Sequence, residues 1–338
     1  MLNASGIGSF LKNIIPYLAE EFDLVLLHNE HDVIEYKAIL IPMKSAIYTI
    51  GEQWELFRKI PKCDLFWSPH YNIPLLPIRA KKRLATIHDV YPLAYFDTLS
   101  WVQKMYAKLF FYAVLRLCDF VASDSNFTCD EIGRHCSVKR EIKPILLSIS
   151  SRFVEKKDHK KEYLLAGGNI KPHKNLLRLV QAYETMDCEQ KLLIIGKKEG
   201  LRTRDDALLS YVEKHLNERV IFTGYVSDEE VVDLYAGAKL FIFPSYYEGF
   251  GLPPLEAMAC GCPVVAARAA SIPEICQDAV YYVDPYDIDS IRAGMETVLK
   301  NEVLRLELIA KGREWVKRFP QENTAKHYIK YIHERTGK

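Results

Sequence analysis

Residues 243–261 read FPSYYEGFGLPPLEAMACG, and this stretch decides the fold that we expect for the chain. A short apolar run precedes it, and a segment with helical spacing follows its two glycines. Gly249 and Gly251 carry no side chain, so backbone N–H groups there can approach an anion closely. Prolines suit a first helical turn, whose N–H groups are unpaired in any case. The stretch therefore predicts a strand, a tight turn and a helix start that attracts phosphate.

The same alternation of apolar run and helical period continues on both sides of this stretch. In the first half we expect strands at 23–28, 65–68, 84–88, 120–123 and 142–146. In the second half we expect them at 163–167, 191–195, 220–224, 240–244, 264–266 and 280–283. This pattern is typical of parallel βαβ units. We therefore expect an α/β protein of two doubly wound, Rossmann-like domains, with ligands at the carboxyl ends of the strands.

The length of 338 residues also fits two domains. A polar segment at 148–161 follows a buried-looking strand and is the expected linker. We expect an acceptor-side domain at 1–150 and a nucleotide-binding domain at 151–318. The segment 319–338 is expected to form a C-terminal helix able to pack back on the first domain.

Composition and charge exclude several classes of protein. With 45 Lys and Arg against 44 Asp and Glu, no overall field attracts nucleic acid. The eight cysteines show no C-x-x-C pair and no zinc spacing, so we expect reduced thiols. No long uncharged apolar run and no signal peptide are present, which indicates a cytoplasmic protein. The only D-x-D, at 287–289, lies at the start of a late helix, so we expect no metal and no cofactor.

Two carboxylates flank the turn: Glu248 precedes it, and Glu256 follows after seven residues, inside the expected helix. Two anchored acceptors suit a ligand with several hydroxyls. Each Glu alone is equally well read as a surface residue or as one that favours the helix dipole. Together with the glycines and prolines, the pair favours a binding site.

The string EGFGLPPLEAMACGCPVVA resembles the signature of family 4 retaining glycosyltransferases, mannosyltransferase-like "glycosyl transferases group 1" enzymes with the GT-B fold. The resemblance implies two Rossmann-like domains facing across a cleft. It also implies that Glu248 contacts the transferred sugar and that Glu256 binds ribose hydroxyls. The backbone that would hold sugar and diphosphate is that of Gly249, Phe250, Gly251 and Leu252.

Two further loops of the second half are similar to loops of that family. In GGNIKPHKN, the resemblance makes Lys174 the cation that neutralises the donor diphosphate, with Asn169 beside the donor; a capping loop with a solvated lysine is the alternative. Many relatives carry an arginine at the position of Asn169 or of His173, so either another cation helps or diphosphate binding is weaker. In FTGYVSDEE, Tyr225 and Val226 are expected to frame the base, although this segment also reads as a plain strand end.

In the first half, Gly6, Ile7 and Gly8 fail as a dinucleotide fingerprint, because Leu11 stands at the third glycine position. The resemblance makes them a loop that faces the donor diphosphate. Relatives have a strand before this loop, and here Met1 comes five residues before Gly6. Either the start codon was assigned too late, or the first sheet lacks a central strand.

The resemblance places His88 in the cleft beside the sugar, while a lone histidine at a strand end is more often a core residue. The acceptor-side candidates are Asp89, His70 and Tyr71. Lys104 and Lys108, with the aromatic residues of 101–112 and the basic cluster 79–83, form a candidate contact with anionic membrane. Core packing of this segment is the favoured alternative.

The function expected is transfer of a hexose from a nucleoside diphosphate sugar, with a GDP-mannose-like donor favoured, to a hydroxyl of a glycan or lipid-linked acceptor. By family analogy the anomeric configuration is retained, and catalysis depends on Glu248, Lys174 and His88. Two alternatives stay open. One is another GT-B sugar-nucleotide enzyme, such as an epimerase, and the other is a non-catalytic sugar-nucleotide-binding subunit.

Overall fold

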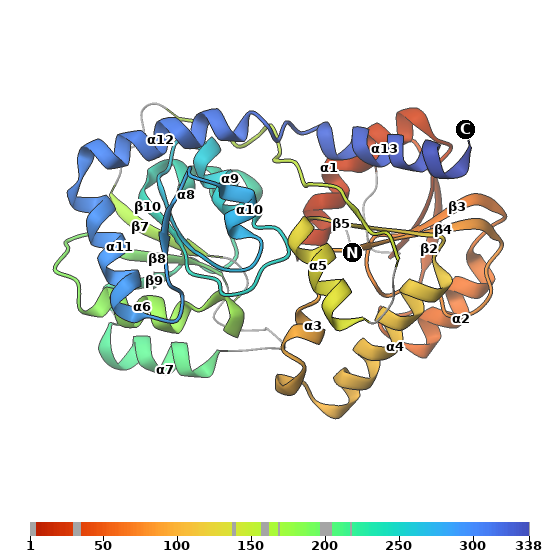
Figure 1. The fold of residues 1–338 in the computed structure, drawn as a ribbon, viewed down its shortest axis with the longest axis horizontal. Helices are drawn as coiled ribbons and strands as arrows, with labels where there is room; N and C mark the ends of the chain where they lie inside the picture. Colours follow the sequence, from red (N-terminus) through yellow and green to blue (C-terminus); the bar gives the residue numbers. More distant parts are fainter. Residues whose placement is uncertain are drawn as a thin grey trace. The chain divides into compact units, whose positions relative to one another are not determined.

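The computed structural model describes residues 5–29, 35–136, 140–156, 162–167, 170–196, 205–216 and 218–337. The chain divides into two compact units (Figure 1). Unit 1 consists of Met1–Ser148 and Gln321–Lys338, and unit 2 of Ile149–Pro320. The division near residue 148 lies two residues from the boundary expected from the linker.

Unit 2 contains a parallel sheet of six strands in the order β12-β11-β10-β7-β8-β9. The strands are β7 (Tyr163–Gly167), β8 (Leu192–Ile195), β9 (Val220–Phe222), β10 (Ala238–Phe243), β11 (Val264–Ala267) and β12 (Tyr281–Val283). The first residue of each of the six strands lies within two positions of the one expected from the sequence. Strand order reverses between the neighbours β7 and β10, where Phe241 pairs with Leu165. Such a reversal is the point where α/β sheets bind ligands.

Helices connect these strands and bury the sheet. They are α6 (Leu176–Glu184), α7 (Asp206–His215), α8 (Asp228–Gly237), α9 (Leu252–Ala259), α10 (Ile272–Cys276), α11 (Ile288–Lys300) and α12 (Glu302–Val316), with a 3-10 turn η2 (Pro172–Lys174). The core combines buried strand residues such as Leu164 and Leu240 with Leu179 of α6 and Met295 of α11. This packing fixes the loops at the carboxyl ends of the strands.

Unit 1 has two parallel sheets among its described residues. One pairs β1 (Val25–Asn29) with β2 (Ile39–Met43), and the other contains β3 (Cys63–Ser68), β4 (Ala80–Ile87), β5 (Phe120–Ser123) and β6 (Lys143–Pro144) in that order. Strand β2 was not expected. Ile39 is 66% exposed, and Pro42 interrupts the apolar run. A proline is tolerated in a strand at the edge of a sheet, but it removes the pattern by which the strand could be recognised in the sequence.

The helices of unit 1 are α1 (Ser5–Glu21), α2 (Ile50–Lys59), α3 (Tyr91–Ala94), α4 (Trp101–Leu117), α5 (Asn126–His135) and α13 (Asn323–Thr336), with a 3-10 turn η1 (Phe96–Thr98). The expectation of a loop at Gly6 and Ile7, with Gly8 opening the helix, is wrong, because α1 begins at Ser5 and includes all three. Phe10, Ile14 and Leu18 are buried at helical spacing, so packing against the core stabilises this helix despite its two glycines.

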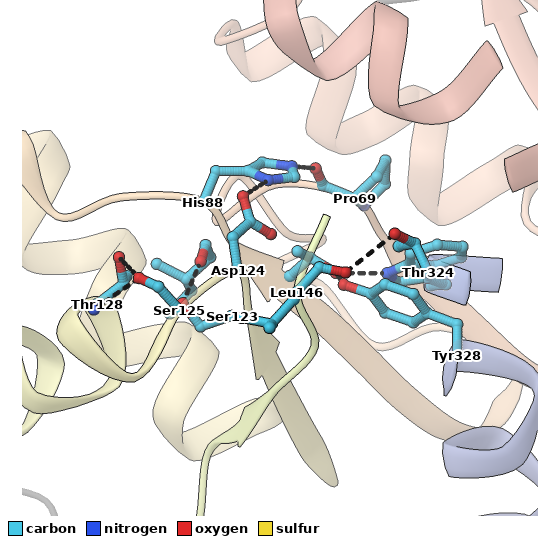
Figure 2. A network of polar contacts seen from close by, with 12 residues as sticks. Pro69, His88, Ser123, Asp124, Ser125, Thr128, Leu146, Thr324 and Tyr328 are labelled. Atoms are coloured by element: carbon cyan, nitrogen blue, oxygen red, sulfur yellow. Dashed lines mark hydrogen bonds and ion pairs between the residues drawn. The ribbon is translucent and has the colours of Figure 1, made fainter. Parts of the chain in front are cut away.

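Helix α13 belongs to the core of unit 1 and lies beside α1 (Figure 1). Tyr328 is completely buried, and its hydroxyl lies 2.9 Å from Thr86 Oγ1 on β4. Thr324 Oγ1 donates to Leu146 O at 2.9 Å, and Thr324 N donates to Ser148 Oγ at 2.9 Å (Figure 2). The first unit is therefore completed by residues from the far end of the sequence.

Candidate functional site

The loops after β7 and β10 bring two of the predicted residues together in unit 2. Lys174 Nζ lies 2.6 Å from Glu248 Oε1, and each side chain is 14% exposed. The two residues are 74 positions apart, and they meet because β7 and β10 are neighbours at the reversal of strand order. The structure thus forms an ion pair from the expected diphosphate cation and the expected sugar carboxylate.

Asn175 holds these two loops together. It adopts a left-handed conformation with φ of 60°. Its Nδ2 donates to Pro244 O at 3.1 Å and to Pro285 O at 2.7 Å, and the residue is 4% exposed. Tyr246 N also donates to His173 O, at 3.0 Å. This role of Asn175 could not be predicted, because its partners are backbone carbonyls distant in the chain.

A glycine and a serine fix the turn into α9. Gly251 has φ of +109°, and a Cβ there would lie 2.5 Å from Ile272 Cδ1, so a side chain is excluded. Ser271 Oγ lies 2.9 Å from Glu248 O and 2.7 Å from Phe250 O, to which it donates. Ser271 stands at the N-cap position of α10 but makes no side-chain capping bond there. In the sequence it looks like an ordinary helix cap, so its contact with the turn could not be predicted.

Lys174 supplies the positive charge beside Glu248 at this turn. Its Nζ lies 5.3 Å from the centroid of the Phe243 ring, which adds a cation–π contact. Burial lowers the pKa of the neighbouring His173 to about 4, so that ring is neutral at pH 7. An ammonium beside the N-terminus of α9 can bind a diphosphate, since both attract anions.

Glu256 lies on α9, where Tyr235 Oη donates to its Oε2 at 3.2 Å. Burial raises the pKa of Glu256 to about 7, while the Tyr235 bond and the Arg152 charge oppose the shift. Arg152 itself pairs with Asp228, the first residue of α8. Neither Tyr235 nor Arg152 was expected at the site, because no local pattern links either of them to residue 256.

Two other predicted donor residues lie at the edge of the sheet. Tyr225 and Val226 lie between β9 and α8, two strands away from β7, and the Tyr225 side chain is 77% exposed. An exposed ring at the carboxyl end of a strand offers a face for stacking. Asn169 lies outside the described residues.

In unit 1, His88 is held between two acceptors at the carboxyl ends of the strands (Figure 2). Its Nδ1 lies 2.7 Å from Asp124 Oδ2, and its Nε2 lies 2.9 Å from Pro69 O. Each of these contacts needs one proton, so His88 and Asp124 together hold two. Neither ring nitrogen has a lone pair available to a ligand while both contacts stand.

The pKa directions of this pair agree with that proton count. Burial alone lowers the pKa of His88, but Asp124 and Pro69 O outweigh it and the pKa is raised. Burial raises the pKa of Asp124, although His88 opposes this. Asp124 is 2% exposed, and within the described part of the chain its Oδ1 has no hydrogen-bond partner.

The acceptor-side candidates surround His88 but are largely packed. Asn72 N donates to His70 Nδ1 at 3.1 Å, so the remaining proton of this ring is on Nε2. Burial lowers the pKa of His70 to about 3. The Tyr71 ring stacks between His70 and Phe111, with centroids 4.0 and 4.5 Å away. Asp89 Oδ1 accepts from Tyr91 N at 2.9 Å.

Neither a metal-binding cluster nor a membrane-spanning helix occurs among the described residues. They contain no group of three or more His, Cys, Asp or Glu placed to hold a metal ion. No helix described here is both long enough and apolar enough to cross a bilayer.

Comparison with known proteins agrees with this geometry. The model of the family "Glycosyl transferases group 1" matches residues 148–315, which contain the Lys174–Glu248 pair. The chain is 30% identical over 317 residues to O-antigen chain mannosyltransferase B of Escherichia coli, covering 89% of this chain and 80% of that protein. It is 29% identical over 287 residues to O-antigen chain mannosyltransferase RfbU of Salmonella typhimurium, covering 84% and 77%.

Solved structures show the same fold. Sucrose-phosphate synthase of Thermosynechococcus elongatus matches with a TM-score of 0.80 at 20% identity, covering 98% of this chain and 94% of that one. Anabaena Alr3699/HepE in complex with UDP-glucose matches with a TM-score of 0.79 at 15% identity, covering 99% and 97%. The expected α/β architecture of the GT-B class is thereby confirmed.

Proposed function

Since the chain belongs to the glycosyl transferases group 1 family and is a retaining hexosyltransferase of polysaccharide synthesis, we propose that its donor is GDP-mannose or a closely related nucleotide sugar. Two relatives that cover more than four fifths of this chain are named as mannosyltransferases, which supports mannose. The acceptor we propose is a hydroxyl of a glycan or lipid-linked glycan. We further propose that the enzyme works in the cytoplasm, at the inner face of the membrane, where a lipid-linked acceptor lies.

The observation that supports transfer from a nucleoside diphosphate donor is the contact between Lys174 and Glu248 at the reversal of strand order. A leaving nucleoside diphosphate gains negative charge in the transition state, and a fixed ammonium stabilises that state more than the ground state. When a diphosphate takes over Lys174, the Glu248 carboxylate is released to orient sugar hydroxyls and to stabilise positive charge on the anomeric carbon.

We assign the ribose to Glu256 and the diphosphate to Lys174 with the backbone of the turn at Gly249 to Leu252. The acceptor hydroxyl then attacks on the face from which the diphosphate leaves, and a donor phosphate oxygen takes its proton. Lys174 and the N–H groups at the start of α9 perform the charge neutralisation for which other transferases use a divalent ion. We therefore propose that the reaction needs neither metal nor cofactor.

Sugar transfer measured with purified full-length protein tests the donor. We expect GDP-mannose to give product with a suitable glycan acceptor, and UDP-glucose to give at least 10-fold less. We expect Glu248→Gln to raise the barrier by about 2 to 4 kcal/mol, roughly a 30- to 800-fold loss of kcat. Preference for a UDP-sugar would overturn the donor assignment, and full activity of Glu248→Gln would overturn the role of that carboxylate.

A further inference from the structure

Helix α4 of unit 1 is apolar on two opposite faces. One face packs into the core through residues such as Ala107, Phe110, Phe111 and Val114. The other face is not covered by the described residues of unit 1, and its large apolar side chains are between 51% and 74% exposed: Trp101, Val102, Met105, Leu109 and Tyr112. The core-packing interpretation of this segment is therefore correct for one face and wrong for the other.

The exposed residues form a continuous stripe. Positions 101, 105, 109 and 112 follow one another at helical spacing, so their side chains project from the same side of the helix. A helix that is hydrophobic all round is normally covered all round, by protein or by lipid. Scattered single apolar residues need no explanation, but a stripe of five does.

The charges on α4 are all positive. Its 17 residues include Lys104, Lys108 and Arg116 and no Asp or Glu. Lys104 Nζ and Lys108 Nζ lie 5.1 and 4.6 Å from the centroid of the Phe96 ring, and Arg116 lies 5.1 Å from that of Tyr112. An acidic residue, Asp97, lies 3.9 Å from Lys104. These cations border the apolar stripe.

Further large apolar side chains are exposed at the start of α2. The Tyr48 and Tyr106 rings lie 5.8 Å apart and join the segment before α2 to α4. Ile47, Ile50 and Trp54 are 45%, 81% and 55% exposed there. The two carboxylates of α2 do not oppose the positive charge. Glu52 is buried and accepts from Asn72, and Glu55 pairs with Lys59.

We propose that the α4 surface, defined as Trp101, Met105, Leu109, Tyr112, Lys108 and Arg116, docks unit 1 on the anionic face of a lipid bilayer. Amphipathic helices with Trp, Leu and basic residues bind at that interface, where the apolar side chains insert and the cations meet lipid phosphates. The proposal rests on the proposed function only in that a lipid-linked acceptor would give the docking its purpose.

Charge argues against a second copy of the chain as the occupant. In a two-fold dimer the same surface lies on both partners, so Lys108 and Arg116 would face an equally positive patch. Like charges destabilise such a contact. An anionic membrane satisfies both the apolar stripe and the positive border.

Vesicle sedimentation with the full chain tests the proposal without any sugar substrate. We expect binding to vesicles of equal phosphatidylglycerol and phosphatidylcholine, weaker binding to pure phosphatidylcholine, and weakening with salt. The triple variant Trp101→Gln, Met105→Gln, Leu109→Gln should lose at least 10-fold in partitioning. The control Val303→Gln, Leu306→Gln removes two side chains of α12 that are 78% and 58% exposed, and should bind as the unchanged protein does.

Three outcomes would overturn the proposal. The first is that the triple variant binds vesicles as well as the unchanged protein does, and the second is that the control loses as much binding as the triple variant. The third is that the triple variant has a lower apparent mass than the unchanged protein in gel filtration without lipid, which would indicate that this surface binds a second copy of the chain. If the triple variant fails to fold, Lys108→Glu with Arg116→Glu replaces it, and unchanged binding of that variant to anionic vesicles counts equally against the proposal. Transfer to a water-soluble acceptor should persist in every variant, so loss of vesicle binding and failure of the enzymatic proposal remain separate results.

Discussion

The two units place polar residues at the same end of a parallel sheet but use them differently. In unit 2, Lys174 and Glu248 come from two loops, contact each other and remain 14% exposed. In unit 1, His88 is enclosed between Asp124 and Pro69 O, and the Asp124 side chain is only 3% exposed. The unit 2 pair can exchange its partner for a ligand, whereas the unit 1 pair joins three segments of its own unit. We therefore propose that the same kind of sheet edge serves binding in unit 2 and cohesion in unit 1.

Breaking the unit 1 pair should have the largest effect. We expect Asp124→Ala to lower the free energy of unfolding by about 3 to 5 kcal/mol, because one partner of a buried charge pair is removed. Urea unfolding measures this change. The exposed pair Lys81–Asp64 is the control, and Asp64→Ala should have a much smaller effect. Equal small losses in both variants would contradict the comparison.

The unit 2 pair should affect rate rather than stability. We expect Lys174→Ala to raise the barrier by about 2 to 4 kcal/mol, measured as a lower kcat, and to change the free energy of unfolding less than the Asp124 substitution does. Lys171→Ala is the matched control, since Lys171 is exposed in the same loop. A large loss of stability with kcat unchanged would make Lys174 a structural residue.

The pH dependence of stability sharpens the contrast. The pKa of His88 is raised above its ordinary value of 6.5, so its contribution is fully present below about pH 6.5. That contribution is lost as the pH rises through the folded-state pKa. We expect the midpoint of thermal unfolding to fall over this range, and to fall less in His88→Gln. An identical slope in both proteins would show that the pair keeps its protons.

The smallest effect should be on donor affinity. Burial raises the pKa of Glu256 to about 7, so the carboxylate that we assign to ribose is partly protonated at neutral pH. We expect donor KM to fall by about 10-fold from pH 6 to pH 8, because the ionised fraction of a carboxyl group with a pKa of about 7 rises by about that factor over this range. Tyr235→Phe should move this transition to higher pH, because it removes the hydrogen bond that stabilises the charged form. A KM that is independent of pH would contradict the assignment.

Much of unit 2 could be predicted from the sequence, and less of unit 1. Strands such as β7 and β10 are buried on both faces and appear as short apolar runs, which are easy to locate. Strand β2 is a half-exposed edge with a proline, so it carries no such signal. The meeting of Lys174 and Glu248 follows from where strand order reverses. Ser271 and Tyr235 could not be predicted, because their partners are set by packing between distant segments.

Helix α13 also has a consequence for how the protein is made. A ribosome delivers all of unit 2 before it delivers Asn323–Thr336, the helix that buries Tyr328 against β4. Unit 2 can therefore fold while unit 1, though begun first, still exposes the apolar surface that this helix will cover. Domains generally fold as they emerge, first the one nearer the N-terminus. Here the order of completion is reversed, and the half-finished first unit is the species most open to aggregation or chaperone binding during synthesis.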